Sequence, residues 1–271
     1  MNERETRMVD ILKDLRDNHH VIGVKAEFEA EGTRLEEALR LKEVITKAGL
    51  DLTIKIGGCE AFKDMYDARS IGVNRIVAPM IESAYALRKY LQMAKRVFAD
   101  MERKAVSFFV NIETKQGNEN FPEMLTIPEF KDLGGVVLGR VDLTGSLGLK
   151  RDDINSDAVF AIAERLFTTA KKAGLTCAVG GGVAKESLPF FRRLTAGCLD
   201  YYETRKVLFK CPESFGDNGD KGILKAVGFE LMWLKNKREF YGAIFEEDAQ
   251  RIAMLESRYQ KLINEAGGKT E

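Results

Sequence analysis

Two apolar stretches, VSFFVNIET (106–114) and GVVLGRVDL (135–143), decide the fold of this chain. Both are rich in Val, Ile, Leu and Phe, and neither alternates strictly between apolar and polar residues. That pattern is typical of parallel strands that are covered on both faces. Each stretch ends in polar residues, which places chemically useful side chains at the carboxyl end of the predicted strand.

The same strand-like pattern recurs along the chain. The other predicted strands are VIGVKAEFE (21–29), LTIKIGG (52–58), RIVAPMIES (75–83), TCAVGGG (176–182) and LDYYETR (199–205). Helical periodicity is predicted between them over 33–48, 59–71, 82–102, 156–174 and 184–196. Glycines follow four of these helices, as helix-terminating glycines do: Gly49, Gly72, Gly174 and Gly197.

Strand and helix alternate without a break in composition, which indicates one α/β domain. Because crossovers between parallel strands are right-handed, the units either close into a barrel or spread into an open sheet. The number of units and the polar residues after nearly every strand favour a (β/α)8 TIM barrel. Only seven strands are clear, and we expect the eighth in the N-terminal region, where 3–18 has a helical pattern.

The C-terminal region differs from the rest. From residue 219 to 266 there is no proline, and apolar residues recur at alternating steps of three and four, as at a helix–helix seam. Arg238 and Asp248 interrupt the seam, so one helix and two helices are both open. We therefore predict a barrel domain over 1–215 and a long C-terminal helical extension over 216–271. The extension packs on the helices of its own barrel or contacts a second subunit of a homo-oligomer.

The charge, apolar and cysteine content of the chain gives no sign of a nucleic-acid-binding, membrane-spanning or zinc-site protein. The chain has 271 residues, with 42 Lys plus Arg and 42 Asp plus Glu, so its formal net charge is zero. A balanced charge provides no general attraction for nucleic acid or an anionic membrane. No apolar run is long enough to span a bilayer, and the four cysteines lack zinc-site spacing. We expect a cytoplasmic protein that acts on a small molecule, with no nucleic-acid or membrane partner.

Two carboxylates stand at the ends of the two strands quoted first. Glu113 ends one strand and Asp142 ends the next. Adjacent parallel strands lie about 4.8 Å apart, so both carboxylates can point at one ion. Two carboxylates with open positions for water and substrate oxygens suit Mg²⁺ or Mn²⁺. The alternative for each is a helix cap or an ion pair with a Lys or Arg at the rim.

These segments resemble the HpcH/HpaI aldolase and citrate lyase β-chain superfamily, a group of metal-dependent pyruvate and phosphoenolpyruvate barrels. The motifs that carry the resemblance are IET (112–114), GRVDLTGSLG (139–148), VAPMIES (77–83) and IGV (71–73). They occur in the family's order and spacing, and the similarity runs from about residue 50 to 205.

The resemblance implies a lyase or aldolase that acts on a 2-oxo acid. Glu113 and Asp142 would bind Mg²⁺ or Mn²⁺, which stabilises the enolate left when a C–C bond breaks. Backbone amides around Gly139, Arg140 and Val141 would face the carboxylate of the substrate, and the Arg140 side chain would help to neutralise it. Glu82 would hold a metal-bound water, or would cap the helix that begins at Ser83.

The sequence departs from the family at two positions that matter for catalysis. Lys55 stands where the family has an arginine that contacts the oxo oxygen, and lysine lacks the planar two-pronged donor of arginine. An early-strand aspartate–histidine pair of the family is also missing. The only histidines, His19 and His20, precede the strand 21–29 and so lie at its wrong end.

That first strand offers another acid/base group. Alternation sends Lys25, Glu27 and Glu29 to one side of the strand. We predict that Glu27, or the Lys25–Glu27 pair, replaces the missing histidine, with a structural layer of ion pairs as the alternative. Two other functions stay open: an acyl-CoA lyase like the citrate lyase β chain, which needs a basic pocket, and a barrel that binds metal and oxo acid without catalysis.

Overall fold

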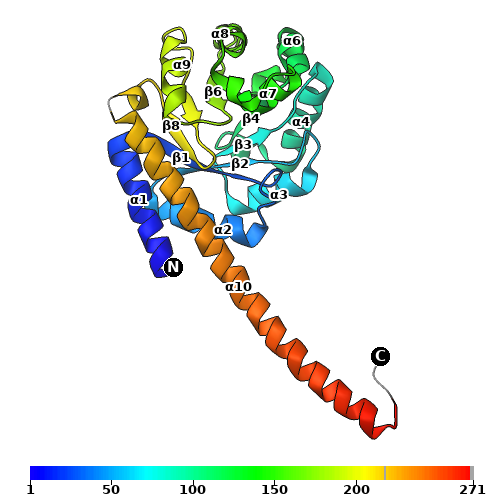
Figure 1. Cartoon of the computed structure of the whole chain (residues 1–271). Helices are drawn as coiled ribbons and strands as arrows, with labels where there is room; N and C mark the ends of the chain where they lie inside the picture. The colour runs from blue at the N-terminus through cyan, green and yellow to red at the C-terminus, as the bar shows by residue number, and fades with distance from the viewer. Residues whose placement is uncertain (217, 269–271) are drawn as a thin grey trace. The chain divides into compact units, whose positions relative to one another are not determined.

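The computed structural model describes residues 1–216 and 218–268. Eight strands, β1 to β8, form a closed barrel (Figure 1). The chain divides into two compact units, Met1–Glu230 and Leu231–Glu271, and each is described by itself. The first unit contains the whole barrel, which confirms the predicted (β/α)8 architecture.

The strands follow the predicted order around the barrel. Their bounds are β1 Val21–Glu27, β2 Asp51–Lys55, β3 Arg75–Ala78, β4 Ser107–Ile112, β5 Gly135–Gly139, β6 Thr176–Gly180, β7 Tyr201–Glu203 and β8 Val207–Lys210. Neighbours from β1 to β7 pair in parallel, and the register sets Glu27 beside Lys55. Parallel pairing brings the carboxyl ends of these seven strands to one mouth.

The eighth strand lies elsewhere than the sequence suggested. β8 directly follows β7 and pairs antiparallel with both β7 and β1. A tight turn joins them, in which the backbone N–H of Val207 donates to Thr204 Oγ1 at 3.1 Å. The prediction of an N-terminal eighth strand was wrong because an antiparallel pair needs no crossover helix. The run 199–210 therefore contains two strands with no helical spacer to separate them.

The helices largely match their predicted positions. Their bounds are α1 Glu3–His19, α2 Leu35–Ala48, α3 Phe62–Ile71, α4 Ala84–Val97, α5 Asp100–Arg103, α6 Lys115–Met124, α7 Arg140–Ser146, α8 Asp157–Lys172, α9 Leu188–Arg193 and α10 Gly219–Glu265, with 3-10 turns η1 Pro128–Asp132, η2 Arg151–Asn155, η3 Lys185–Ser187 and η4 Glu213–Phe215. The predicted strand 135–143 stops at Gly139 and turns into α7, so Asp142 lies in the first turn of a helix.

Apolar side chains fill the lower barrel. Val77, Val137, Ala178 and Leu208 pack inside it as part of one buried cluster. At the floor, the guanidinium of Arg75 lies 5.1 Å from the ring of Phe109 and 5.2 Å from that of Tyr201, and it donates to Thr53 Oγ1 at 3.0 Å. This packing closes the floor, so the polar ends of the strands face a cavity only at the mouth.

The C-terminal extension is one helix, α10, and neither Arg238 nor Asp248 breaks it. Its first turns belong to the barrel unit, where Ile223, Ala226 and Phe229 are buried. No helix among the described residues is long and apolar enough to cross a membrane.

Candidate functional site

A cavity of about 400 Å³ opens at the carboxyl ends of the strands. Predicted site residues from β1, β2, the end of β4, β5 and α7 line it: Lys25, Glu27, Lys55, Glu113, Gly139, Val141 and Asp142. The fold thus brings most of the predicted site together. Its lining has two halves of different chemistry: Glu113, Asp142 and glycines form one, and the ion-paired Lys25, Glu27 and Glu203 form the other.

Glu113 follows β4 and is held firmly in place. Its carboxylate is buried and accepts hydrogen bonds from the Met80 backbone N–H at 2.9 Å and from Asn111 Nδ2 at 2.8 Å. Lys55 Nζ lies 3.9 Å from its Oε2. Burial raises the pKa of Glu113 because the charged form loses water, although Lys55 opposes this rise. A cation at this carboxylate would stabilise its charged form.

Asp142 lines the same cavity from the first turn of α7. It is exposed, and its carboxylate has no hydrogen bond or ion pair within the described chain. Burial is the main cause of the raised pKa of Glu113, and the charge of Asp142 adds to it. One fixed and one free carboxylate fit the ligand set of Mg²⁺ or Mn²⁺, with waters and substrate oxygens completing the shell. No group of three His, Cys, Asp or Glu side chains suited to a metal occurs among the described residues.

Glycines form the wall beside these carboxylates. A Cβ built on Gly139 would lie 2.4 Å from Glu113 Oε2, so only glycine lets this carboxylate pack against β5. Gly181 has φ +80°, and a Cβ there would lie 2.7 Å from the backbone N of Val141. The loop after β6 and the first turn of α7 therefore meet backbone to backbone.

Arg140 takes a different position from the one expected. Its side chain does not line the cavity; it is fully buried and donates to the carbonyl oxygens of Gly180 at 3.2 Å and Gly181 at 3.0 Å. The expectation that this side chain neutralises substrate charge is not met by direct contact, since the guanidinium lies outside the cavity. The reason is local, because the chain enters α7 at Arg140 and this residue no longer follows the alternation of a strand.

Glu82 also lies outside the cavity. Its Oε1 accepts a hydrogen bond from Thr114 Oγ1 at 2.6 Å, which links the loop after β3 to the residue following Glu113. Ser83, not Glu82, caps α4 by accepting a hydrogen bond from the Ala86 backbone N–H.

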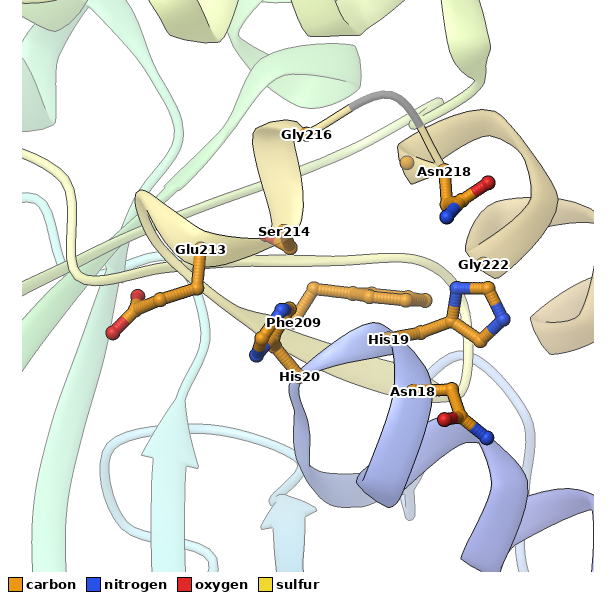
Figure 2. A pocket seen from close by; sticks show the side chains of 10 residues that line it. Asn18, His19, His20, Phe209, Glu213, Ser214, Gly216, Asn218 and Gly222 are labelled. Atoms are coloured by element: carbon orange, nitrogen blue, oxygen red, sulfur yellow. The ribbon is translucent and has the colours of Figure 1, made fainter.

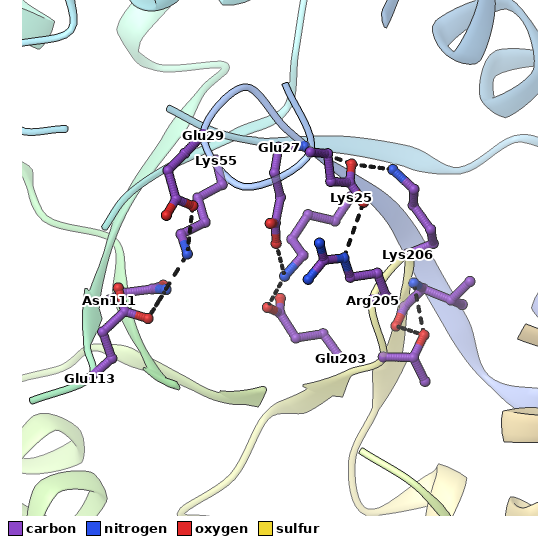
Figure 3. Close-up of polar contacts among 12 residues, drawn as sticks. Lys25, Glu27, Glu29, Lys55, Asn111, Glu113, Glu203, Arg205 and Lys206 are labelled. Carbon is purple, nitrogen blue, oxygen red and sulfur yellow. Dashed lines mark hydrogen bonds and ion pairs between the residues drawn. The ribbon is translucent and has the colours of Figure 1, made fainter. Parts of the chain in front are cut away.

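The opposite half of the mouth is a layer of ion pairs (Figure 3). Lys25 Nζ lies 3.0 Å from Glu27 Oε1 and 2.5 Å from Glu203 Oε1, and all three side chains are buried. Burial alone would lower the pKa of Lys25, but the two carboxylates outweigh it and raise the pKa. Burial likewise tends to raise the pKa of Glu27, but Lys25 and Lys55 bring the pKa of this carboxyl below its usual value. Glu27 is therefore an ionised carboxylate at neutral pH.

Glu203 was missed by the sequence reasoning. It stands in YYETR, two residues after the inward-facing Tyr201, and this spacing was the only available signal. Its Oε2 is buried and has no hydrogen-bond partner among the described residues.

Lys55 bridges the two halves. Its Nζ is 3.1 Å from Glu29 Oε2 and 3.9 Å from Glu113 Oε2, and these carboxylates together with Glu27 raise its pKa against the effect of burial. An amine nucleophile needs a lowered pKa, and neither lysine lining the cavity has one.

Known proteins share this fold and these motifs. The sequence model of the HpcH/HpaI aldolase/citrate lyase family matches residues 33–185, more than half of the chain. The chain belongs to this family. No curated protein sequence matches the chain. The family consists of lyases and aldolases, so this member is an enzyme of that kind.

Solved structures of this family are similar in fold. An HpcH/HpaI aldolase from Desulfitobacterium hafniense DCB-2 has a TM-score of 0.61 at 14% identity, covering 85% of this chain and 88% of that one. Citrate synthase SbnG has a TM-score of 0.60 at 14% identity, covering 86% and 90%. An HpcH/HpaI aldolase/citrate lyase family protein from Burkholderia cenocepacia J2315 has a TM-score of 0.56 at 15% identity, covering 92% and 99%.

The histidines of this HpcH/HpaI member lie away from the mouth, as expected. His19 and His20 line a separate cavity of about 120 Å³ with Phe209 and Asn218 (Figure 2). His19 Nε2 lies 3.0 Å from Lys225 Nζ, and burial followed by this positive charge lowers the pKa of the imidazole. The mouth cavity therefore contains no histidine among its lining residues.

Proposed function

We propose that the protein is a divalent-metal-dependent aldolase or lyase that breaks or forms a C–C bond of a pyruvate-type 2-oxo acid. One observation carries the proposal. Glu113 and Asp142 line one cavity at the mouth, and the motifs that contain them are those of a lyase family.

Glu113 and Asp142 would hold Mg²⁺ or Mn²⁺. Bound there, the ion supplies Lewis-acid stabilisation of the enolate charge on the oxo acid. Asn111 and the Met80 backbone fix Glu113 from behind, which orients the carboxylate toward the cavity.

The remaining cavity residues would bind the oxo acid and move a proton. Lys55 neutralises negative charge beside Glu113, and the backbone around Gly139 and Val141 faces the substrate carboxylate. In the cleavage direction, Glu27 accepts the proton of the hydroxyl on the carbon that becomes the aldehyde. The electrons of the broken C–C bond go to the pyruvate enolate, and protonation at its methylene carbon gives pyruvate.

Exchange of pyruvate methyl hydrogens with deuterated solvent tests this proposal. We expect exchange to require added Mn²⁺ or Mg²⁺, and to fall at least about a hundredfold in Glu113→Gln and in Asp142→Asn. Glu102→Gln, which removes an exposed partner of Arg69, serves as the control and should exchange like the wild type. Wild-type exchange in either cavity variant would refute the proposed roles.

The acyl-CoA lyase alternative is less well supported by the cavity. Among its lining cations, Lys25, Lys55 and Arg205 each pair with a carboxylate, and only Arg151 has no partner within the described residues. Adenine nucleotide phosphates need several unpaired cations. Calorimetry with coenzyme A should show no binding at millimolar concentration.

A second copy of the chain would cover the C-terminal helix. Within Leu231–Glu271, the residues Ile252, Leu255, Tyr259 and Leu262 follow steps of three and four and are each more than half exposed. The same apolar residues on the helix of a second copy can pack against these. Two helices paired in this way bury apolar surface that a single helix exposes to water. We expect sedimentation to show that the wild-type chain is an oligomer. Leu255→Glu should dissociate this oligomer, and the conservative Leu255→Met should leave it intact. A monomeric wild-type chain would contradict this expectation.

A further inference from the structure

The guanidinium of Arg140 is the most deeply buried charge near the mouth. Its side chain is fully buried, and besides the two glycine carbonyls it donates to Asn155 Oδ1 at 2.6 Å and to Ser187 Oγ at 3.1 Å. The guanidinium also lies 5.2 Å and 5.0 Å from the ring centres of Phe190 and Phe191. All its hydrogen-bond partners are neutral.

No carboxylate pairs with Arg140 in the part of the chain that the structure describes. The other buried cations near the mouth each have one: Lys25 pairs with Glu27 and Glu203, Lys55 with Glu29, and Lys206 with Glu31. The guanidinium of Arg140 is a cation at neutral pH. A buried charge without a counter-charge is strongly unfavourable for folding.

The Arg140 guanidinium lies next to residues that line the cavity. Its hydrogen bonds join the loop after β6 at Gly180 and Gly181, the turn η2 through Asn155, and the turn η3 through Ser187. Gly180 and Gly181 themselves line the cavity that contains Glu113 and Asp142. The guanidinium therefore lies directly behind the glycine wall and fixes that wall from the far side.

We propose that Arg140 is a positioning residue whose unpaired buried charge, together with its clamp on the glycine wall, attracts the carboxylate of the substrate without touching it. The proposal rests on the function above, in which an oxo acid occupies this cavity. A substrate anion supplies the counter-charge that the folded chain lacks, and low polarity around the guanidinium lets its field reach the cavity.

This role predicts effects of opposite sign on two ligands. A positive charge behind the wall attracts an anion and repels a metal cation. Removing it therefore weakens anion binding and tightens metal binding. Mere loosening of the loops would weaken both, so the sign of the metal effect separates the two explanations.

The experiment titrates Mn²⁺ alone by electron paramagnetic resonance, and oxalate with and without Mn²⁺ by calorimetry. Oxalate carries the paired oxygens of a 2-oxo acid. We expect Arg140→Gln, which keeps amide donors, to weaken oxalate binding about tenfold and to tighten Mn²⁺ binding several-fold, because the variant lacks the positive charge. Arg140→Lys keeps the charge and should leave Mn²⁺ affinity within about threefold of the wild type. Arg140→Met is the neutral substitute if the glutamine variant does not fold.

Arg75→Gln is the matched control. Arg75 also lies about 5 Å from two aromatic rings, but at the barrel floor. It should leave both affinities unchanged. Weaker or unchanged Mn²⁺ binding in folded Arg140→Gln would overturn the proposal. A wild-type chain that binds no Mn²⁺ refutes the metal site instead, and the metal-free oxalate titration still measures the charge effect. A wild-type chain that binds no oxalate in either condition overturns the Arg140 proposal itself.

Discussion

The two halves of the barrel mouth differ in whether their charged side chains have ion-pair partners. On the side of β1, β2 and β7, each cation contacts carboxylates: Lys25 bridges Glu27 and Glu203, and Lys55 contacts Glu29. On the side of β4, β5 and β6, Asp142 has no partner among the described residues and the wall is glycine. In the first half each of these cations has a carboxylate partner, whereas the second half leaves a carboxylate and an open wall for a ligand.

The contrast indicates which half does which task. Paired charges are fixed in position, as a group that must accept a proton in one geometry requires. The unpaired carboxylate of Asp142 is available to bind a cation, and the backbone of the glycine wall is available to bind an anion. The two halves meet at Lys55, which contacts carboxylates of both.

The largest effect on stability should come from removing the cation at the centre of the ion-paired half. Lys25→Met leaves Glu27 and Glu203 buried without their shared cation, and we expect a loss of about 3–5 kcal/mol in the free energy of unfolding at pH 7. Urea denaturation measures it. Lys210→Met removes an exposed partner of Glu213 and should cost less than about 1 kcal/mol. Equal effects of the two variants would show that the buried pairs are not fixed as described.

A single glycine-to-alanine substitution should disrupt the glycine wall of the cavity. In Gly181→Ala the new Cβ meets the Val141 backbone, and at φ +80° we expect a loss of about 2–3 kcal/mol and weaker oxalate binding. Gly174→Ala is the control, because Gly174 has φ +79° with no atom within 4 Å of a Cβ. It should cost about 1 kcal/mol and leave oxalate binding unchanged. The same oxalate affinity in both variants would remove the glycine wall from the binding site.

A smaller effect should appear in the pH dependence of stability. The pKa of Glu27 is lower in the folded chain than its usual value, because Lys25 and Lys55 outweigh the effect of burial. Its stabilising contribution is therefore present above the unfolded pKa and lost as the pH falls through the folded pKa. In Glu27→Gln, the free energy of unfolding should therefore fall less than in the wild type as the pH is lowered. An unchanged decline in this variant would mean that Glu27 is not the ionised partner of Lys25.

The sequence predicted the barrel and the open half of the mouth better than the paired half. Strand ends and family motifs both pointed to Glu113 and Asp142, and both side chains line the cavity. β8 was not found, since an antiparallel strand after a tight turn has no helical spacer. Glu203 was not found because its partner Lys25 lies far away in sequence.

Arg140 shows a second limit of sequence reasoning. Its motif placed it at the barrel mouth, but the side chain lies outside the cavity because a helix begins there. Side-chain direction depends on the residue at which a strand ends. The pattern of apolar residues extended that strand to residue 143, whereas it stops at Gly139.

The central claim is that Glu113 and Asp142 bind one divalent ion. Titration of the wild-type chain with Mn²⁺, followed by electron paramagnetic resonance, measures it directly. We predict one site per chain, lost in Glu113→Gln and in Asp142→Asn and retained in Glu102→Gln. Unchanged stoichiometry and affinity in either cavity variant would contradict the account.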